Sequence, residues 1–410
     1  MEAAGGEGER TKFGAVMMRV TQKAKAGLGQ KLSYAAKWMP RYVWQRFTRR
    51  LPRTGHVIVA LADHFEPSIT ATPGEFAEYH EQERRIEKWC REYPRQMGEF
   101  RDSEGHALLH TYFYPAEQYD RAHLEELAEH CSAGWGEIEI HLHHGMNAPD
   151  SAENTRRVLE EFRDRLAREH GALSYEAGSS GPRYAFVHGN FALANSDGGR
   201  NCGVDAEMQI LSDTGCYADM TLPTAPWHGA QIAKINSIYE CGAPLTTRLS
   251  QGRGRNLTVG RRPQILPLVV QGPLLADFGG TKAIAIDNGA LTGRNPATLR
   301  RFAKWKRSAI SVEGRPDWIF VKLHCHGMDP RDDQAMLGEP MRNFLRELTG
   351  AAGERGETLH FTTAREMVNI ILAACDGREG NPGEYRDYRF RRGQPAADSQ
   401  ARTLEAEVRG

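Results

Sequence analysis

Residues 137–143 read Glu-Ile-Glu-Ile-His-Leu-His, and this stretch indicates both the fold and the chemistry of the chain. Apolar and polar residues alternate strictly, which predicts a β-strand whose successive side chains point to opposite faces. The three apolar residues would face the packed side, and Glu139, His141 and His143 would share the other face. Two imidazoles at positions i and i+2 of a strand can bind one metal ion without distorting the backbone. The alternative is a polar strand end whose histidines form only hydrogen bonds.

Two other segments place the same residue types after strand-like runs. Residues 62–67 read Ala-Asp-His-Phe-Glu-Pro after an apolar run, and residues 322–326 read Lys-Leu-His-Cys-His at the end of another. Histidine and carboxylate side chains at the carboxyl ends of parallel strands can meet around a divalent ion. We therefore predict a metal site for zinc, with nickel, cobalt, manganese and iron as alternatives. The candidate metal ligands are Asp63, His64, His141, His143 and His144.

The same segments supply candidate catalytic groups for hydrolysis by a metal-activated water. Asp63 or Glu66 could take a proton from the water, and His324 or His326 could donate one to the leaving group. Asp63 could instead cap a turn, and the two late histidines could be further ligands or ordinary hydrogen-bonded residues at a barrel mouth. Cys325 would point to the other face, which favours a position in the core over a role as nucleophile.

Polar and aromatic residues in the loops predicted near this mouth could bind a sugar. Gly189 follows a strand-like run and would let the backbone approach a substrate closely, and aromatic rings suit the apolar face of a sugar. The alternative for each residue is ordinary loop packing. The candidate substrate-binding residues are His188, Asn190, Tyr217, Asp219 and Trp227.

Between residues 51 and 376 strand-like and helix-like segments alternate, which predicts crossover connections and a mainly parallel sheet. About seven or eight such units fit a β/α barrel with long loops. The predicted strands are 56–61, 108–113, 137–142, 184–188, 265–270, 282–286, 318–323 and 358–361. The predicted helices are 75–96, 152–169, one capped by Asn295 and running to about residue 307, and one that starts at Thr363.

The two ends of the chain differ from this central domain. Residues 1–50 form a basic extension, because Lys and Arg dominate residues 10–53 and alternate with apolar residues, which predicts one or two amphipathic helices. Such helices could attach to an anionic membrane surface, or they could pack on the domain with a solvated basic face. Residues 377–410 are rich in Gly, Pro, Arg and Glu, which predicts a disordered tail.

The composition limits the class of protein. The 410 residues are 40% hydrophobic and 26% charged with zero formal net charge, so no general attraction to nucleic acid is expected. Seven cysteines without a Cys-x-x-Cys pair indicate reduced thiols and a cytoplasmic location. No apolar run is long enough to span a bilayer and no secretory signal is present, so we expect a cytoplasmic protein or one peripheral to a membrane. The sequence does not specify an oligomeric state.

The order and spacing of these motifs resemble the polysaccharide deacetylase superfamily, which is carbohydrate esterase family 4 in the broad sense. Asp63-His64 stands where the family has its acidic pair after the first strand, and the strand that ends in His141 matches the second motif. The His-Leu-His triplet is similar to that of a subgroup, and the strand that ends in His326 resembles the last motif. The resemblance spans residues 57–374.

The resemblance implies a fold, a cofactor and a reaction. The fold is α/β, a distorted (β/α)7 TIM-like barrel, and the cofactor is a divalent metal bound by one aspartate and two histidines. The reaction is hydrolysis of an N- or O-acetyl group on a carbohydrate. Carried over to this chain, Asp63, His141 and His143 become ligands, and His324 or His326 becomes the acid.

The chain also departs from the family pattern. His64 stands where a second aspartate is usual, Gly145 stands where the common second motif has its second histidine, and an Arg-Pro-Pro-Tyr segment is missing. We predict a metal-dependent deacetylase acting on an acetylated amino sugar or polysaccharide. One alternative is a catalytically degenerate protein on the same fold that binds glycan or joins a biosynthesis complex. Another is a glycoside hydrolase with Asp287 and Asp219 as its carboxylates.

Overall fold

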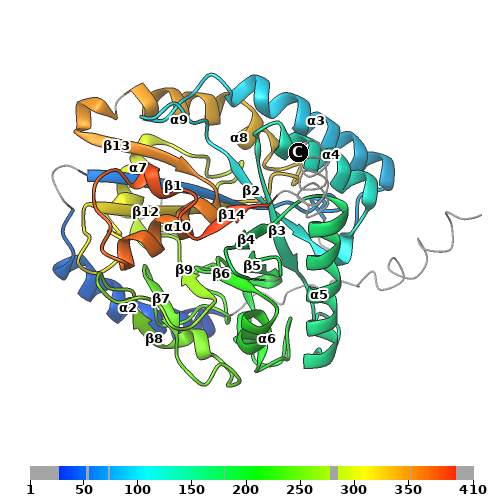
Figure 1. The fold of residues 1–410 in the computed structure, drawn as a ribbon. Coiled ribbons are helices and arrows are strands. Elements are labelled where there is room, and N and C mark those ends of the chain that lie inside the picture. Colours follow the sequence, from blue (N-terminus) through cyan, green and yellow to red (C-terminus); the bar gives the residue numbers. More distant parts are fainter. Residues whose placement is uncertain are drawn as a thin grey trace, which may run out of the picture.

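A ten-stranded, mostly parallel sheet organises the protein (Figure 1). The computed structural model describes residues 27–51, 55–72, 74–179, 181–277, 285–350 and 352–393. The strand order is β12-β1-β2-β3-β5-β6-β9-β7-β8, and β13 also pairs with β1. The strands are β1 (Gly55–His64), β2 (His110–Pro115), β3 (Gly136–Leu142), β5 (Tyr184–His188), β6 (Cys216–Asp219), β7 (Ile238–Cys241), β8 (Gly254–Asn256), β9 (Leu268–Val270), β12 (Trp318–Cys325) and β13 (Glu357–Thr362).

Helices and two small sheets surround this sheet (Figure 1). The helices are α2 (Leu28–Thr48), α3 (Tyr79–Met97), α4 (Arg121–Ser132), α5 (Ala152–Glu169), α6 (Glu207–Asp213), α7 (Leu299–Lys306), α8 (Asp333–Leu337), α9 (Glu339–Gly350) and α10 (Ala364–Cys375). The small sheets pair β10 (Leu275–Asp277) with β11 (Ala285–Asp287) and β14 (Phe390–Arg392) with β4 (Ser174–Glu176). The mixed α/β class predicted from the sequence is therefore confirmed.

Strand β1 lies at the centre of the parallel part of the sheet. β12 pairs with it along residues 56–63, β13 pairs with its first half, and β2 pairs with its second half. β3 pairs with β2, and β5 pairs with β3. Because these strands all run parallel, their carboxyl ends lie along one edge of the sheet, where β1, β3 and β12 end in histidine-containing segments.

The two faces of the sheet belong to different hydrophobic clusters. Val59 and Leu61 of β1 pack into the cluster that contains the buried side chains of α3, α4 and α5. Ile58 and Ala60 point the other way and pack with helix α10, which is buried over nearly its whole length. Figure 1 shows α10 to the left of the centre of the view, with α3, α4 and α5 along the upper right and right. We call the face toward α10 the inner face.

The edges of the sheet approach each other through a short linking segment. The backbone N–H of Phe320 in β12 donates to the carbonyl of Ile310 at 2.8 Å. The N–H of Glu313 donates to the carbonyl of Leu257, just after β8, at 2.8 Å. Among the described strands no direct ladder joins β12 to β8, so the described residues form a curled sheet without a continuous closed barrel.

Several predicted elements are confirmed, and others are corrected. The predicted strands correspond to β1, β2, β3, β5, β9, β12 and β13, and helix α5 has the predicted bounds. Strand 282–286 is corrected to β11, which pairs with β10 outside the main sheet. The cap of α7 is Thr298, whose side chain accepts from the N–H of Arg301, whereas Asn295 forms a turn with Thr292.

The basic extension packs on the domain through one helix. In α2 the side chains of Trp38, Tyr42 and Gln45 are buried, and the indole N–H of Trp38 donates to the carbonyl of Pro226 at 3.1 Å. The opposite side of α2 exposes apolar side chains such as Phe47, so attachment to a membrane surface stays a prediction. The predicted residues 10–26 lie outside the described residues. None of the described helices is long and apolar enough to cross a bilayer.

The prediction of a disordered tail from residue 377 is wrong for residues 377–393. Strand β14 pairs with β4, and the ring of Phe390 is buried in contact with the ring of Tyr217 at a centroid distance of 4.6 Å. Asn369 of α10 accepts from the N–H of Phe390 at 2.8 Å. A single buried aromatic residue thus anchors a segment whose overall composition is polar. Residues 394–410 lie outside the described residues.

Candidate metal centre

The carboxyl ends of β1, β3 and β12 bring several histidines and a glutamate together. The ring centroids of His141 and His143 are 4.5 Å apart, and those of His64 and His141 are 5.0 Å apart. The ring of His64 is also 4.8 Å from that of His326 and 6.0 Å from that of His324. We call this set the histidine group; its members are His64, Glu66, His141, His143, His324 and His326.

Glu66 forms the centre of the histidine group. Its Oε1 lies 3.0 Å from Nε2 of His143 and 3.4 Å from Nε2 of His141. Its other oxygen, Oε2, lies 3.8 Å from Nε2 of His326. Burial by itself would raise the pKa of Glu66, but contact with His141 and His143 outweighs burial and holds this pKa well below its usual range. Glu66 is therefore a carboxylate, the form that binds a metal ion.

The far side of each ring is held by a hydrogen-bond acceptor. His141 Nδ1 donates to the carbonyl of Val187 at 2.7 Å, and His143 Nδ1 donates to the carboxylate of Glu117 at 2.6 Å. Because Nδ1 of each ring is engaged on the far side, Nε2 is the nitrogen of both rings that is directed toward Glu66. Such outer contacts orient metal-binding histidines and raise their basicity.

The ring of His143 lies between two carboxylates. Burial lowers its pKa, but Glu117 and Glu66 outweigh this effect and raise the pKa to about 10. The ring is therefore positively charged, and its charge offsets the negative charges of the two carboxylates beside it. A divalent ion can take the place of the proton on Nε2, because metal binding releases protons from its ligands.

Three side chains of the histidine group fit a divalent metal. The ligand atoms of Glu66, His141 and His143 all lie within 4.8 Å of one another. Two histidines and one carboxylate form a usual catalytic zinc set, which leaves a position for water or substrate. Other divalent metals accept the same ligands, so the donor set does not determine the identity of the ion.

The remaining histidines surround these three ligands. Burial, followed by the positive charge of neighbouring histidines, lowers the pKa of His64 well below its usual value. Burial, followed by Lys322, does the same to His324. The side chain of His326 is 30% exposed, whereas that of His143 is 19% exposed and that of His141 is fully buried. Neutral imidazoles therefore lie inside the group, and His326 lies at its accessible side.

The structure corrects the prediction that Asp63 is a ligand and base beside His141 and His143, because Asp63 belongs to a separate buried set with His110 and Cys325. The carboxylate of Asp63 accepts from Nδ1 of His110 at 2.8 Å and from the N–H of Gly327 at 2.7 Å. The reason is the alternation of β1: the side chain that follows Leu61 by two residues faces the helices. Glu66, predicted as a base, takes the ligand position instead.

The structure also separates His144 and His188 from the histidine group. Both rings belong to another buried cluster, together with Cys202 and Glu207. His188 is fully buried, so it cannot line a substrate-binding surface as predicted. His144 does not share the inner face with His141 and His143, because it follows the end of β3 at Leu142 and lies one residue out of phase with those two histidines.

Two of the predicted substrate-binding residues are inside the protein. The hydroxyl of Tyr217 donates to Glu139 at 2.5 Å, and the carboxylate of Asp219 accepts from the hydroxyl of Thr221 at 2.7 Å. Neither Tyr217 nor Asp219 has any exposed surface. These side chains belong to β6, which the sequence pattern did not identify as a strand, and their position in the sheet explains their burial.

The other two predicted substrate-binding residues lie at the surface. The side-chain amide of Asn190 donates to the sulfur of Met146 at 2.8 Å, and Asn190 is half-buried. The ring of Trp227 is 39% exposed. A role for Asn190 and Trp227 in substrate binding stays a prediction.

The buried carboxyl of Asp219 should make stability depend on pH. Burial raises its pKa to about 7, whereas an aspartate in an unfolded chain titrates near 4. The folded protein binds this proton more tightly, so stability should fall by about 1.4 kcal/mol per pH unit as pH rises from about 4 to about 7. Asp219→Asn should remove that part of the slope. Denaturant unfolding at several pH values measures it, and an unchanged slope in the variant would contradict the assignment.

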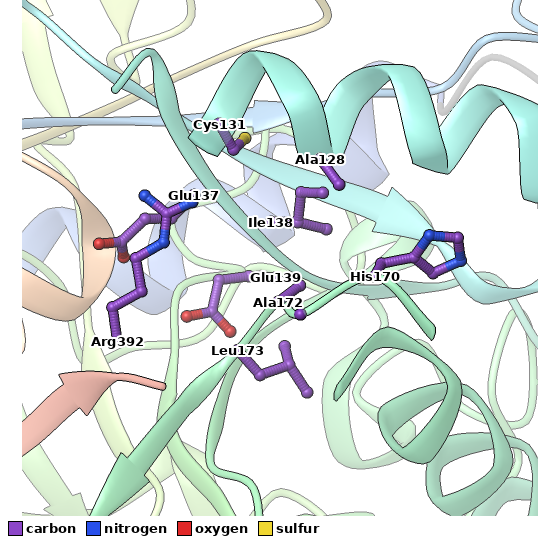
Figure 2. Close-up of a pocket in the computed structure, with 10 residues that line it drawn as sticks. Ala128, Cys131, Glu137, Ile138, Glu139, His170, Ala172, Leu173 and Arg392 are labelled. Atoms are coloured by element: carbon purple, nitrogen blue, oxygen red, sulfur yellow. The ribbon is translucent and has the colours of Figure 1, made fainter. Parts of the chain in front are cut away.

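A small cavity of about 20 Å³ lies at the opposite end of β3 (Figure 2). It is lined by side chains that include Glu137, Ile138 and Glu139 of β3, and Figure 2 shows Glu137 beside Arg392 at one edge and His170 at the other. No member of the histidine group lines this cavity. It is therefore separate from the candidate metal centre.

The sequence analysis missed several residues that build this region. Glu117 orients His143, and Phe191 lies with its ring 6.1 Å from that of His64. Glu117 follows the carboxyl end of β2, so the rule that found the other strand-end groups could have found it. Phe191 lies in an irregular loop, where no periodic pattern could have identified it.

No protein-family model matches this chain, and a search of curated proteins gives no significant match. The functional conclusions below therefore depend on the geometry of the site and on the motif order in the sequence.

Proposed function

We propose that the protein is a metal-dependent hydrolase that removes acetyl groups from an acetylated amino sugar or polysaccharide. The observation that carries the proposal is the position of the Glu66 carboxylate, 3.0 Å and 3.4 Å from two Nε2 atoms whose rings are anchored on their far sides. The acetyl substrate follows from the resemblance in motif order to polysaccharide deacetylases.

We infer that the curled sheet is a distorted (β/α)7 barrel, as that resemblance implies. The parallel strands and the link between β12 and β8 through residues 310–313 support this inference. The position of the histidine group supports it too, because barrel enzymes carry their active sites at the carboxyl ends of the strands.

The residues divide the work of hydrolysis as follows. Glu66, His141 and His143 would hold a divalent ion, which would supply Lewis acidity to the acetyl carbonyl and would lower the pKa of a bound water toward neutrality. The neutral ring of His64 lies beside the ligand His141 and accepts a hydrogen bond from the attacking water, and the proton of that water passes to solvent. His326, at the accessible side, donates a proton to the leaving amine or alkoxide as its bond to the acyl carbon breaks.

Metal content tests this assignment against the one that the sequence favoured. We expect His141→Ala to bind about one ion per chain fewer than the wild type and Asp63→Asn to bind as much metal as the wild type, with both proteins checked for folding by circular dichroism. The physical reason is that Asp63 is occupied by His110 and Gly327 on the other face. Loss of the ion in Asp63→Asn with retention in His141→Ala would refute the proposed ligand set.

Acetate and reducing-sugar release separate the alternative functions. With an N-acetylated glucosamine oligosaccharide as the probe, a deacetylase releases acetate and leaves the chain length unchanged. The two carboxylates of the glycoside hydrolase alternative are buried, and Asp287 is paired with Arg301 at 2.8 Å, so this alternative has little support. A protein that binds glycan without catalysis would release neither product.

A further inference from the structure

A second buried cluster of metal-binding residues lies beside the histidine group. It consists of His144, His188, Cys202 and Glu207, whose ligand atoms all lie within 4.8 Å of one another. Oε1 of Glu207 is 2.9 Å from Nε2 of His144 and 3.3 Å from Nε2 of His188. The two Nε2 atoms are 2.9 Å apart. Sγ of Cys202 is 3.5 Å from Oε2 of Glu207.

The far nitrogen of each ring in this cluster is already engaged. Nδ1 of His188 donates to the carbonyl of Gly189, and Nδ1 of His144 faces the carboxylate of Asp150 at 3.0 Å. The hydroxyl of Thr155 donates to the same carboxylate at 2.9 Å. In neutral rings both Nε2 atoms therefore carry lone pairs, and these converge with a carboxylate oxygen. Acceptors this close repel one another unless a cation lies between them.

We propose that His144, His188, Cys202 and Glu207 bind a second divalent ion that is structural rather than catalytic. Ligands around tetrahedral zinc, with bonds of about 2.0–2.3 Å, lie about 3.3–3.6 Å apart. The two Nε2 atoms and Oε1 of Glu207 are 2.9–3.3 Å apart, so these three ligands reach that geometry by moving apart by a few tenths of an ångström. All four ligand atoms already lie within 4.8 Å of one another. A thiolate among the ligands favours zinc over magnesium or calcium.

The cluster has the features of a closed metal site. Four side chains fill a tetrahedral set, and the most exposed of them, His144, is only 5% exposed. No position is left for a substrate, unlike at Glu66, His141 and His143. Binding replaces the thiol proton of Cys202 and the proton shared by the two rings, and these protons pass to solvent.

The second ion would fasten the loop between β5 and α6 to the sheet. His188 lies at the start of this loop, Cys202 lies within it, and Glu207 begins α6, while His144 follows β3. The loop contains five non-glycine residues at positive φ, which cost free energy unless tertiary contacts hold them. Those residues are Asn190, Phe191, Ala194, Asn195 and Asn201.

The same loop forms a wall of the histidine group. The ring of Phe191 lies 6.1 Å from that of His64 and 6.4 Å from that of His324. An ion at Cys202 would therefore hold Phe191 against the proposed catalytic residues. The existence of the second site depends only on its own four ligands, so it does not require the proposed hydrolase function.

Metal content and a cobalt spectrum test the second site. We expect about two ions per chain in the purified protein and about one in Cys202→Ser. Replacing the ions by Co²⁺ should produce a thiolate-to-cobalt charge-transfer absorption in the near ultraviolet. Cys202→Ser should abolish this absorption, whereas Cys90→Ser, a control at a partly exposed helical position, should keep both the ions and the absorption.

Two further variants separate the sites from each other and from folding defects. His143→Ala should lose one ion and keep the thiolate absorption. If Cys202→Ser fails to fold, Glu207→Gln serves as the test in its place. This variant should also lose the second ion. The proposal is overturned if the wild-type cobalt protein lacks the thiolate absorption or if Cys202→Ser retains it, because a proton rather than a metal would then lie between the rings. Absence of acetate release would refute the hydrolase proposal and leave this result intact.

Discussion

Glu66→Gln should remove the ion from the histidine group and lower kcat/KM for acetate release by more than about 100-fold. Loss of a residue that only hydrogen-bonds to a metal ligand already lowers metal affinity or activity by about 10–100-fold, and loss of a ligand should cost more. Glutamine keeps the size of the side chain but not its negative charge. Glu66 is the carboxylate placed between His141 and His143, so no other described acid can replace it there. Metal analysis and a steady-state assay at saturating zinc measure the two effects.

Glu117→Gln is the matched control for this prediction. Glu117 contacts the far nitrogen of His143 and does not belong to the ligand set, so its loss should weaken metal affinity by about 10–100-fold. Added zinc should restore the ion and most of the activity of this variant. If Glu66→Gln retains a full complement of metal under the same conditions, Glu66 is not a ligand.

His326→Ala should lower kcat by about 100- to 10,000-fold while the bound ion is retained. The reason is that its ring lies at the accessible side of the group, 3.8 Å from Glu66, where a leaving group can reach it. A substrate that releases nitrophenolate needs no proton donor, so the variant should act on a nitrophenyl acetate nearly as fast as the wild type does.

His324→Ala provides the comparison for the acid. His324 is almost completely buried, so its loss should reduce kcat less and should affect both types of leaving group equally. If His326→Ala loses its ion, or if it loses activity equally toward both substrates, His326 is not the acid. If His324→Ala, rather than His326→Ala, loses activity only toward the substrate with the poor leaving group, His324 is the acid.

Local alternation predicted which side chains share a face, and most of the histidine group follows from it. The sequence pattern placed Glu139, His141 and His143 on the face opposite the apolar residues of β3, and the structure agrees, because the pleat of a strand has a fixed period of two residues. The same rule puts Asp63 and His64 on opposite faces of β1. The motif resemblance favoured Asp63 as a metal ligand beside His141 and His143. In the structure it is His64 that lies beside these residues.

Burial in the sheet decided which loop predictions failed. Tyr217 and Asp219 read as loop residues because β6 has only four residues, too few for a periodic signal. The ordered position of Phe390 was missed for a related reason: one buried ring contributes little to the composition of a polar segment. In both cases a short element is held by partners that are distant in the chain.

The sequence by itself determined the α/β class, the strands that end in histidines and the face on which His141 and His143 lie. These features depend on neighbours a few residues apart, and local periodicity specifies them. Only the tertiary structure decided that Glu66 rather than Asp63 meets these histidines, and that Cys202 and Glu207 meet His144 and His188. Those contacts depend on how a strand end bends and how an irregular loop folds back, and no local pattern encodes either.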